Sequence, residues 1–186
     1  KSGLLQAPGP VQAIRSDGRT LSASGLDGNT RQGYLDLQQP VTLVLESDRG
    51  RITAGRTRWL FSAEQLESDQ PIQAELKNSK VQGRGFKLDQ RTGTVIISNS
   101  CRVEQTLETL TAQRCAWNWR SERVFADGDV VLQRTEPEQI TRASRMEAKI
   151  SDDGAIRFGQ AGARVESTIK LSPAAQEKPR RPQVSF

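Results

Sequence analysis

Hydrophobic and polar residues alternate one by one through several stretches of the chain. The clearest are "LDLQQPVTLVL" (35–45), "FKLDQRTGTVIIS" (86–98) and "VVLQ" (130–133), in which Val, Ile, Leu, Thr and Phe dominate. This period of two predicts half-buried β-strands. Clusters of turn residues separate them at 27–29, 47–50, 77–79, 91–93, 127–128, 136–138 and 152–154. Short strands between such turns predict an antiparallel meander. The best helical candidate, 103–110, is interpreted as a hairpin tip or at most one helical turn.

A unit of about thirty residues repeats along the chain. The segment "ITAGRTRW" (52–59) recurs as "LTAQRCAW" (110–117), and the similarity continues beyond both copies. Small residues mark the same place in successive copies, at separations of 31, 29, 29 and 31: Ala23, Ala54, Gly83, Ala112 and Ala143. We therefore predict about five stacked units, each holding two or more strands.

The alternation changes phase at the same point of each unit. Ala54 and Trp59, like Ala112 and Cys115, are an odd number of residues apart, so they cannot share one face of a regular strand. A bulge or corner near 55–57, 84–85 and 113–114 would restore the pattern and fold the sheet into a V or flattened roll. The predicted interior comprises Val41, Leu43, Phe61, Ile72, Phe86, Leu88, Val95, Ile97, Val103, Trp117, Trp119, Val130 and Leu132.

The repeat also predicts which residues face each other across hairpins. The expected pairs are Val41 with Thr57, Ile72 with Phe86, Cys101 with Cys115, and Val130 with Met146. Cys101 and Cys115 are the only cysteines, so facing positions favour a structural disulfide over a redox-active pair or a zinc site. A disulfide would place the chain in an oxidising compartment, such as a bacterial periplasm or the cell exterior.

Composition limits the domain count and the partners. A chain of 186 residues with 34% hydrophobic residues predicts one domain with a thin core. We divide it into a lead-in (1–19), one β-domain (20–171) and a Pro-rich basic tail (172–186). The net charge of +5 favours phosphate-bearing partners, but no recognition helix or aromatic-basic motif points to nucleic acid. No secretory signal or membrane span is visible, and we expect that a leader or anchor preceding Lys1 is not included.

The sequence contains few residues that point to catalysis. The chain has no histidine, and Asp127/Asp129 and Asp152/Asp153 flank glycines, where turn formation explains them. We therefore expect no enzyme, metal or cofactor. Arg56 and Arg114 occupy equivalent places and indicate either a phosphate-facing rim or solvated strand ends. Trp117 matches Trp59 across the repeat and shares a face with Cys115, so we interpret both tryptophans as inward-facing rather than as a sugar platform.

The repeating pattern with "ADGDVVL" (126–132) resembles the OstA-like repeats of lipopolysaccharide-transport proteins. Within that superfamily, "QLESDQPI" (65–72) and "VQGRGFKLDQRTGTV" (81–95) resemble the LptC family of lipopolysaccharide-export proteins. The resemblance implies a twisted antiparallel β-jellyroll, called a β-taco, open at both ends. It implies acyl-chain binding inside the sheet, lipopolysaccharide received from an ATP-driven (ABC) transporter, and delivery to an LptA-like protein by edge-strand addition. It also implies a periplasmic location with an inner-membrane anchor. Gly83 matches a structural glycine of the family, whereas the cysteine pair and paired tryptophans depart from it.

Three alternatives stay open. A soluble LptA-like bridge protein differs from an LptC-like protein in lacking the anchor helix. A carbohydrate-binding or lyase β-solenoid would stack parallel rungs of similar length. A purely structural or adhesive β-module would bind no ligand.

Overall fold

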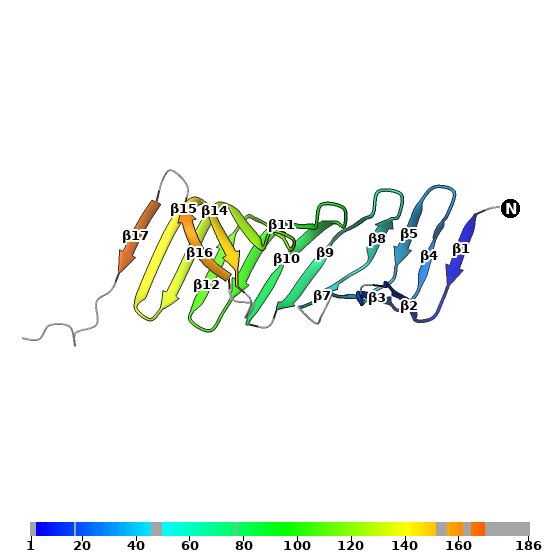
Figure 1. Cartoon of the computed structure of the whole chain (residues 1–186), viewed down its shortest axis with the longest axis horizontal. Helices are drawn as coiled ribbons and strands as arrows, with labels where there is room; N and C mark the ends of the chain where they lie inside the picture. Colours follow the sequence, from blue (N-terminus) through cyan, green and yellow to red (C-terminus); the bar gives the residue numbers. More distant parts are fainter. Residues whose placement is uncertain are drawn as a thin grey trace, which may run out of the picture.

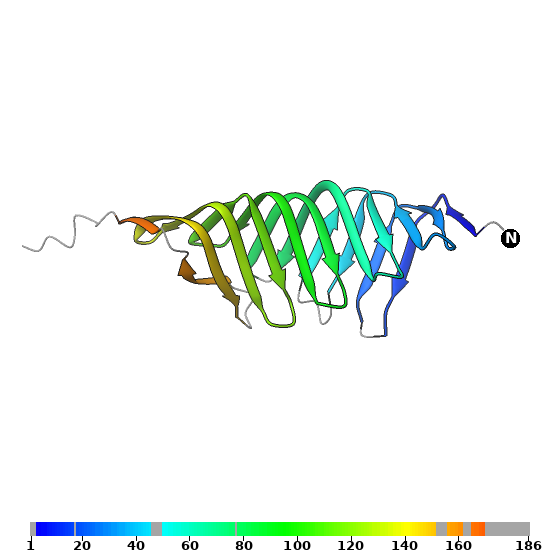
Figure 2. The same ribbon diagram turned by 90° about the horizontal axis from the view of Figure 1, so that it is seen from above.

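All described strands of the chain belong to one antiparallel sheet. The structure is a computed structural model that describes residues 3–16, 18–45, 50–76, 78–151, 156–161 and 165–169. Within these ranges it contains a 17-stranded sheet and no helix. The molecule is elongated, and successive hairpins stack along its long axis from β1 at one end to β17 at the other (Figures 1 and 2). The all-β prediction is confirmed, and the antiparallel pairing is incompatible with the parallel β-solenoid alternative.

The strands of the N-terminal half are mostly short, and those of the C-terminal half include several long ones. The first ten are β1 (Leu4–Ala7), β2 (Val11–Ile14), β3 (Thr20–Ala23), β4 (Leu26–Asn29), β5 (Tyr34–Leu37), β6 (Val41–Val44), β7 (Gly50–Ala54), β8 (Thr57–Leu60), β9 (Gln65–Leu76) and β10 (Ser79–Asp89). The remainder are β11 (Thr94–Glu104), β12 (Glu108–Ala112), β13 (Arg114–Asn118), β14 (Arg123–Thr135), β15 (Glu138–Ile150), β16 (Ile156–Ala161) and β17 (Val165–Ile169). Strands β1 and β2 extend the sheet into the predicted lead-in, whereas the tail 172–186 lies outside the described residues.

The sheet consists of two walls joined along a line of corners. Wall A contains, in order of pairing, β1, β4, β5, β8, 65–68 of β9, 86–89 of β10, 94–97 of β11, β13, 123–127 of β14, 146–150 of β15 and β16. Wall B contains β2, β3, β6, β7, 72–76 of β9, 79–83 of β10, 101–104 of β11, β12, 130–135 of β14, 138–143 of β15 and β17.

The corners lie at the places where the alternation changes phase. Residues 55–56 separate β7 from β8, and residue 113 separates β12 from β13. The long strands bend instead, with register shifts between Arg84 and Phe86 and between Asp127 and Val130. Gly85 has a φ of 72° and Gly128 one of 78°, a backbone conformation that glycine adopts without steric cost. The predicted corners near 55–57, 84–85 and 113–114 are therefore confirmed.

The cross-strand partners differ from those predicted. The first residue of each predicted pair faces one of the small residues that mark the repeat. Val41 faces Ala54, Ile72 faces Gly83, Cys101 faces Ala112, and Val130 faces Ala143. The predicted partners Thr57, Phe86, Cys115 and Met146 lie three residues further along, beyond the corner, and pair in wall A with Leu37, Ser68, Ile97 and Ala126. The prediction was wrong because it assumed that cross-strand pairing continues without interruption through the corner.

Gly83 sits where the strands approach too closely for a side chain. It faces Ile72 across β9 and β10. A Cβ at this position would overlap the Cγ2 atom of Ile97 and lie 3.1 Å from the carbonyl oxygen of Asn99. The expectation of a structural glycine is thus explained by packing at the corner, without any need for a ligand.

Tight turns at the free edge of wall A form a regular ladder. Each turn ends on a residue with positive φ: Gly33, Glu64, Gly93 and Glu122. The carbonyl oxygen of each accepts a hydrogen bond from the next layer, from the amides of Phe61, Gln90, Trp119 and Ile150 respectively. Two predicted turns are misplaced: 27–29 belongs to β4, with the chain reversing at 30–33, and 127–128 lies within β14 at its bend. The segment 103–110 is a hairpin whose tip is 105–107, as predicted.

Candidate functional site

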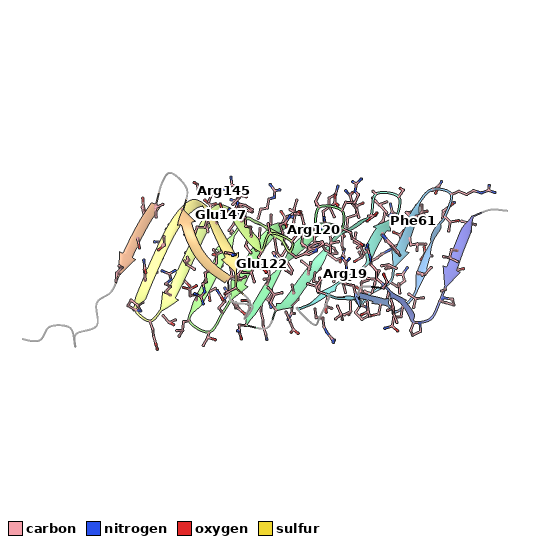
Figure 3. The ribbon with its side chains drawn as sticks, in the orientation of Figure 1. Arg19, Phe61, Arg120, Glu122, Arg145 and Glu147 are labelled. Carbon is pink, nitrogen blue, oxygen red and sulfur yellow. A yellow bond between two sulfur atoms is a disulfide. The ribbon has the colours of Figure 1, made fainter. Side chains whose placement is uncertain are left out.

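The inner faces of the two walls form the apolar interior of the molecule. Nine of the thirteen predicted interior residues are buried in it: Val41, Ile72, Phe86, Leu88, Val95, Ile97, Val103, Val130 and Leu132. Leu43, Trp117 and Trp119 are partly buried and pack against this core. Phe61 is half-buried in the turn after β8 and contacts Trp59 edge to face (Figure 3). The alternating residues of both walls thus point inward, and binding of a lipid by them stays a prediction.

Several interior residues were missed by the sequence analysis although the repeat contains their signal. Ile52 and Leu110 open the two matched segments, and both are buried, at 4% and 1% exposure. Leu66 and Val124 are likewise equivalent and buried. The repeat therefore identifies inward positions more completely than the alternation of any single strand.

A cavity with a volume of about 30 Å³ lies between the walls. Its lining comes from both: Ile52, Ile72, Ala74, Leu76, Val81 and Val103 from wall B, and Val95, Ile97, Cys115, Trp117, Val124, Ile150 and Ile156 from wall A. Ligand pockets usually hold at least about 300 Å³, so an alkyl chain can enter only if the walls separate or side chains move. The structure therefore represents a closed groove.

Two equivalent aromatic pairs line wall A. Trp59 and Phe61 have ring centroids 6.4 Å apart at 78°, and Trp117 and Trp119 repeat this arrangement at 6.4 Å and 69°. The indole nitrogens of Trp59 and Trp117 are buried and have no hydrogen-bond partner. The equivalence of these residues was predicted from the repeat, whereas their unpartnered donors are visible only in the structure.

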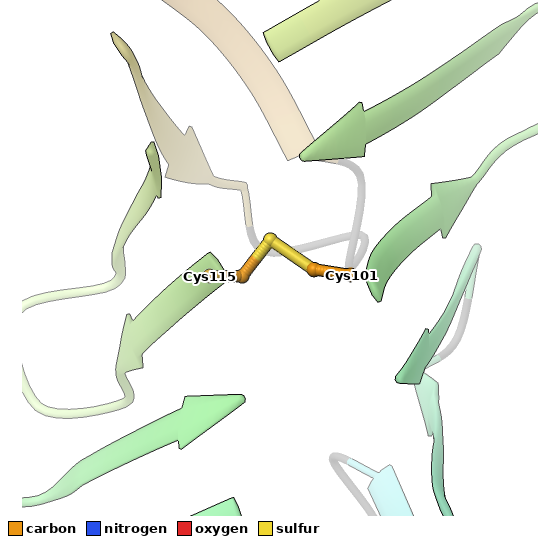
Figure 4. Close-up of a disulfide and its surroundings, with 2 residues drawn as sticks. All are labelled: Cys101 and Cys115. Carbon is orange, nitrogen blue, oxygen red and sulfur yellow. A yellow bond between two sulfur atoms is a disulfide. The ribbon is translucent and has the colours of Figure 1, made fainter. Parts of the chain in front are cut away.

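A disulfide joins the two walls inside the fold, beside the line of corners. Cys101 lies in the wall B part of β11 and Cys115 in β13 of wall A, with Cα atoms 5.8 Å apart (Figure 4). The predicted disulfide is present, but its cysteines are not register partners, because Cys101 faces Ala112 and Cys115 faces Ile97. Both side chains are at most 4% exposed. The disulfide thus fastens the walls near their junction rather than bracing one hairpin.

Two side-chain bridges join the walls at the edge opposite the corners. Gln105, at the tip between β11 and β12, donates a hydrogen bond to the carbonyl oxygen of Ile156 and accepts one from its amide, both 2.8 Å long. Ile156 pairs with Ile150 in wall A and is 2% exposed. Nearer the N-terminus, Arg15 donates to the side-chain oxygen of Gln90 at 2.7 Å. These bridges close the mouth of the groove.

Charged residues lie mainly on the outer face. Arg58 donates two hydrogen bonds to the Asp36 carboxylate, at 2.8 and 2.9 Å, and its guanidinium lies 4.7 Å from the ring centre of Tyr34. The hydrogen bonds from Arg58 lower the pKa of Asp36, since they outweigh the effect of burial, and the charges of Arg58 and Arg56 act in the same direction.

The two equivalent arginines stand on the outer side of the corners. Arg56 is exposed and its Nη2 lies 3.5 Å from the Asp36 carboxylate. Arg114 precedes the inward Cys115 and so points outward, into a shallow depression shared with Asp127 and Asp129. Neither side chain faces the interior, and the acidic neighbours reduce the local positive charge. Binding of phosphate at these positions stays a prediction.

Within the described ranges no three Asp, Glu, Cys or His side chains gather in a way that could hold a metal ion. The same part of the chain contains no helix long and apolar enough to cross a membrane.

Comparisons with known proteins identify a similar fold but no family. No family model matches the chain, and no curated protein matches its sequence. Among solved structures it resembles LptH, the LptA-homologous periplasmic component of the lipopolysaccharide transport device of Pseudomonas aeruginosa, with a TM-score of 0.52 and 15% sequence identity. The similarity covers 61% of this chain and 85% of that one. The fold is therefore an LptA-like β-jellyroll, as predicted.

Proposed function

We propose that this protein binds lipopolysaccharide without chemical conversion, holds its acyl chains between the two walls, and passes it to a neighbouring protein in the periplasm. The observation that carries the proposal is the continuous apolar interior, lined by both walls of a sheet whose fold resembles that of LptH. An alkyl chain placed there would replace contacts that the walls otherwise make with each other. Apolar surface would then stay out of water before and after loading.

Transfer to a neighbour would use the two ends of the sheet. Among the described strands, β1 and β2 at one end and β16 and β17 at the other each have one side without a strand partner. Apolar side chains are exposed at both ends: Leu4, Leu5 and Ile14 at the first, and Val165 and Ile169 at the second. Unpaired edges can extend a sheet into a partner by strand addition. Such an addition would continue the groove from one protein into the next.

The position in the transport chain has two candidates. The motif at 81–95 favours an LptC-like protein, anchored in the inner membrane, that accepts the lipid from an ATP-driven transporter. The structural similarity to LptH favours an LptA-like soluble bridge. The sequence immediately upstream of Lys1 in the gene decides between them, because only the LptC-like role needs an anchoring helix there.

Native mass spectrometry of the purified protein tests the proposed ligand. The protein is offered lipopolysaccharide, a phospholipid and a soluble glycan in parallel. We expect a complex with lipopolysaccharide that survives competition by the glycan. Binding of the glycan alone, or of none of the three, would exclude lipid transport and leave the adhesive or carbohydrate-binding alternatives.

A further inference from the structure

The interior contains two hydrogen-bond donors that the protein does not satisfy. They are the indole N–H groups of Trp59 and Trp117, both buried and without a partner. A buried polar group without a partner destabilises the folded state, and a buried tryptophan N–H usually finds an acceptor. Two unpartnered donors at positions 58 residues apart, equivalent in the repeat, therefore call for a common explanation.

The cross-strand partners of both tryptophans have no hydrogen-bond acceptor in their side chains. Trp117 faces Val95 on one side and Val124 on the other. Trp59 faces Leu35 and Leu66 in the same way. The cavity that Trp117 lines has no charged or amide side chain in its wall. A water molecule needs two to four polar partners to remain buried, so the cavity does not favour a water as the missing acceptor.

We propose that the indole N–H groups of Trp59 and Trp117 donate hydrogen bonds to an oxygen atom of the bound lipid. This inference rests on the proposed function. An ester carbonyl oxygen or a hydroxyl oxygen of an acyl chain fits this role. Such an oxygen would lie deeper in the groove than the head group and can accept a hydrogen bond. The groove thus selects oxygen-bearing acyl chains over plain hydrocarbon chains, because only the former satisfy the donors.

The two donors also mark two places along the groove. Trp59 lies in β8 and Trp117 in β13, with β9, β10 and β11 between them in wall A. Four strand spacings correspond to about 19 Å. A lipid moving along the groove would meet the same donor twice, first at one indole and then at the other.

The indole proton signals of the labelled full chain test the inference by nuclear magnetic resonance. The probes are a dodecanoyl ester of sucrose, which has an acyl carbonyl, and dodecyl maltoside, whose chain carries only an ether-type glycosidic oxygen, a weaker acceptor than a carbonyl. We expect the ester to move the signals of Trp59 or Trp117 downfield and to leave that of Trp119 in place, since Trp119 has no buried unpartnered donor. The ether should produce no such downfield shift.

Substitution separates hydrogen bonding from packing. Trp117→Phe should weaken binding of the ester about tenfold, the equivalent of one lost hydrogen bond, and leave binding of the ether within about twofold. Benzothienylalanine at position 117 keeps the ring shape without the N–H and should reproduce the effect. Tyr34→Phe, which removes a hydroxyl group beside Arg58 on the outer face, is the control and should change neither affinity.

Two outcomes would overturn the inference, and only the second would also overturn the proposed function. If both probes bind but no indole signal moves downfield, or if Trp117→Phe weakens both equally, the donors do not recognise oxygen and the proposed lipid binding survives. If neither probe binds and lipopolysaccharide also fails to bind, the proposed function falls together with the inference.

Discussion

At the scale of single residues, one ion pair on the outer face links the pH to the stability of the fold. Asp36 and Arg58 face each other across β5 and β8 and form two hydrogen bonds. Asp36 is 7% exposed, so its charge depends on these bonds for solvation. Because Arg58 lowers its pKa in the folded state, Asp36 binds a proton less readily there than in the unfolded chain. The pair therefore stabilises the fold above the unfolded pKa and loses this effect as the pH falls through the folded pKa.

The ion pair gives a pH-dependent prediction. Asp36→Asn should lower the free energy of unfolding at neutral pH by about 2 kcal/mol, since hydrogen bonds to a charged group are lost. The difference from the wild type should shrink as the pH falls below about 4, the ordinary range of an unfolded aspartate. Urea unfolding at a series of pH values measures it, with Glu136→Gln at an exposed turn as control. A difference that stays constant down to the acid limit would show that the charge of Asp36 is irrelevant.

The sequence predicted which side chains point inward better than how they meet. Val95, Trp117 and Val130 could be placed in the interior because alternation and repeat agreed on them. The prediction that Cys101 faces Cys115 was wrong. The corner takes residues out of the cross-strand pairing, and the alternation along a single strand does not reveal this. The unpartnered indoles could not be predicted either, since satisfaction of a donor depends on every neighbour in space.

At the scale of elements, the hairpin tip 105–107 and strand β16 control the mouth of the groove. Two hydrogen bonds of Gln105 with Ile156 join them, and Ile156 lines the cavity. The turns of wall A are more firmly linked, because carbonyl-to-amide bonds join one turn to the next, and Arg120 adds a bond of 3.0 Å to the carbonyl oxygen of Gln90. The tip 105–107 and β16 are therefore one place where the walls can part.

Removal of the Gln105 side chain should loosen β16. Gln105→Ala should lower the stability of the contact by about 2 kcal/mol, the sum of two part-buried hydrogen bonds. Hydrogen exchange of the amides in 156–161 should then accelerate by one to two orders of magnitude. Gln133→Ala, on the outer face of β14, is the matched control and should leave these amides unchanged. Unaltered exchange in Gln105→Ala would mean that the β15–β16 pairing alone holds the mouth shut.

At the scale of the whole molecule, the walls fill their own groove. The cavity of about 30 Å³ shows that side chains of both walls occupy the space that a lipid would take. Under the proposed function, loading would exchange wall-to-wall contacts for wall-to-lipid contacts. The disulfide would keep the walls together beside the corners, while the Gln105 contact lies at the opposite edge. Opening at that edge would leave the strand pairing within each wall intact.

Site-specific photo-crosslinking to lipopolysaccharide is the most direct measurement of this account. Val95 and Ile96 are neighbours in β11, and only Val95 lines the groove, so the pair is matched in sequence position and differs in the face it occupies. A photoreactive residue at position 95 should capture lipopolysaccharide, and the same residue at 96 should capture little or none. Equal capture from both positions, or capture from 96 alone, would contradict the binding of acyl chains between the walls.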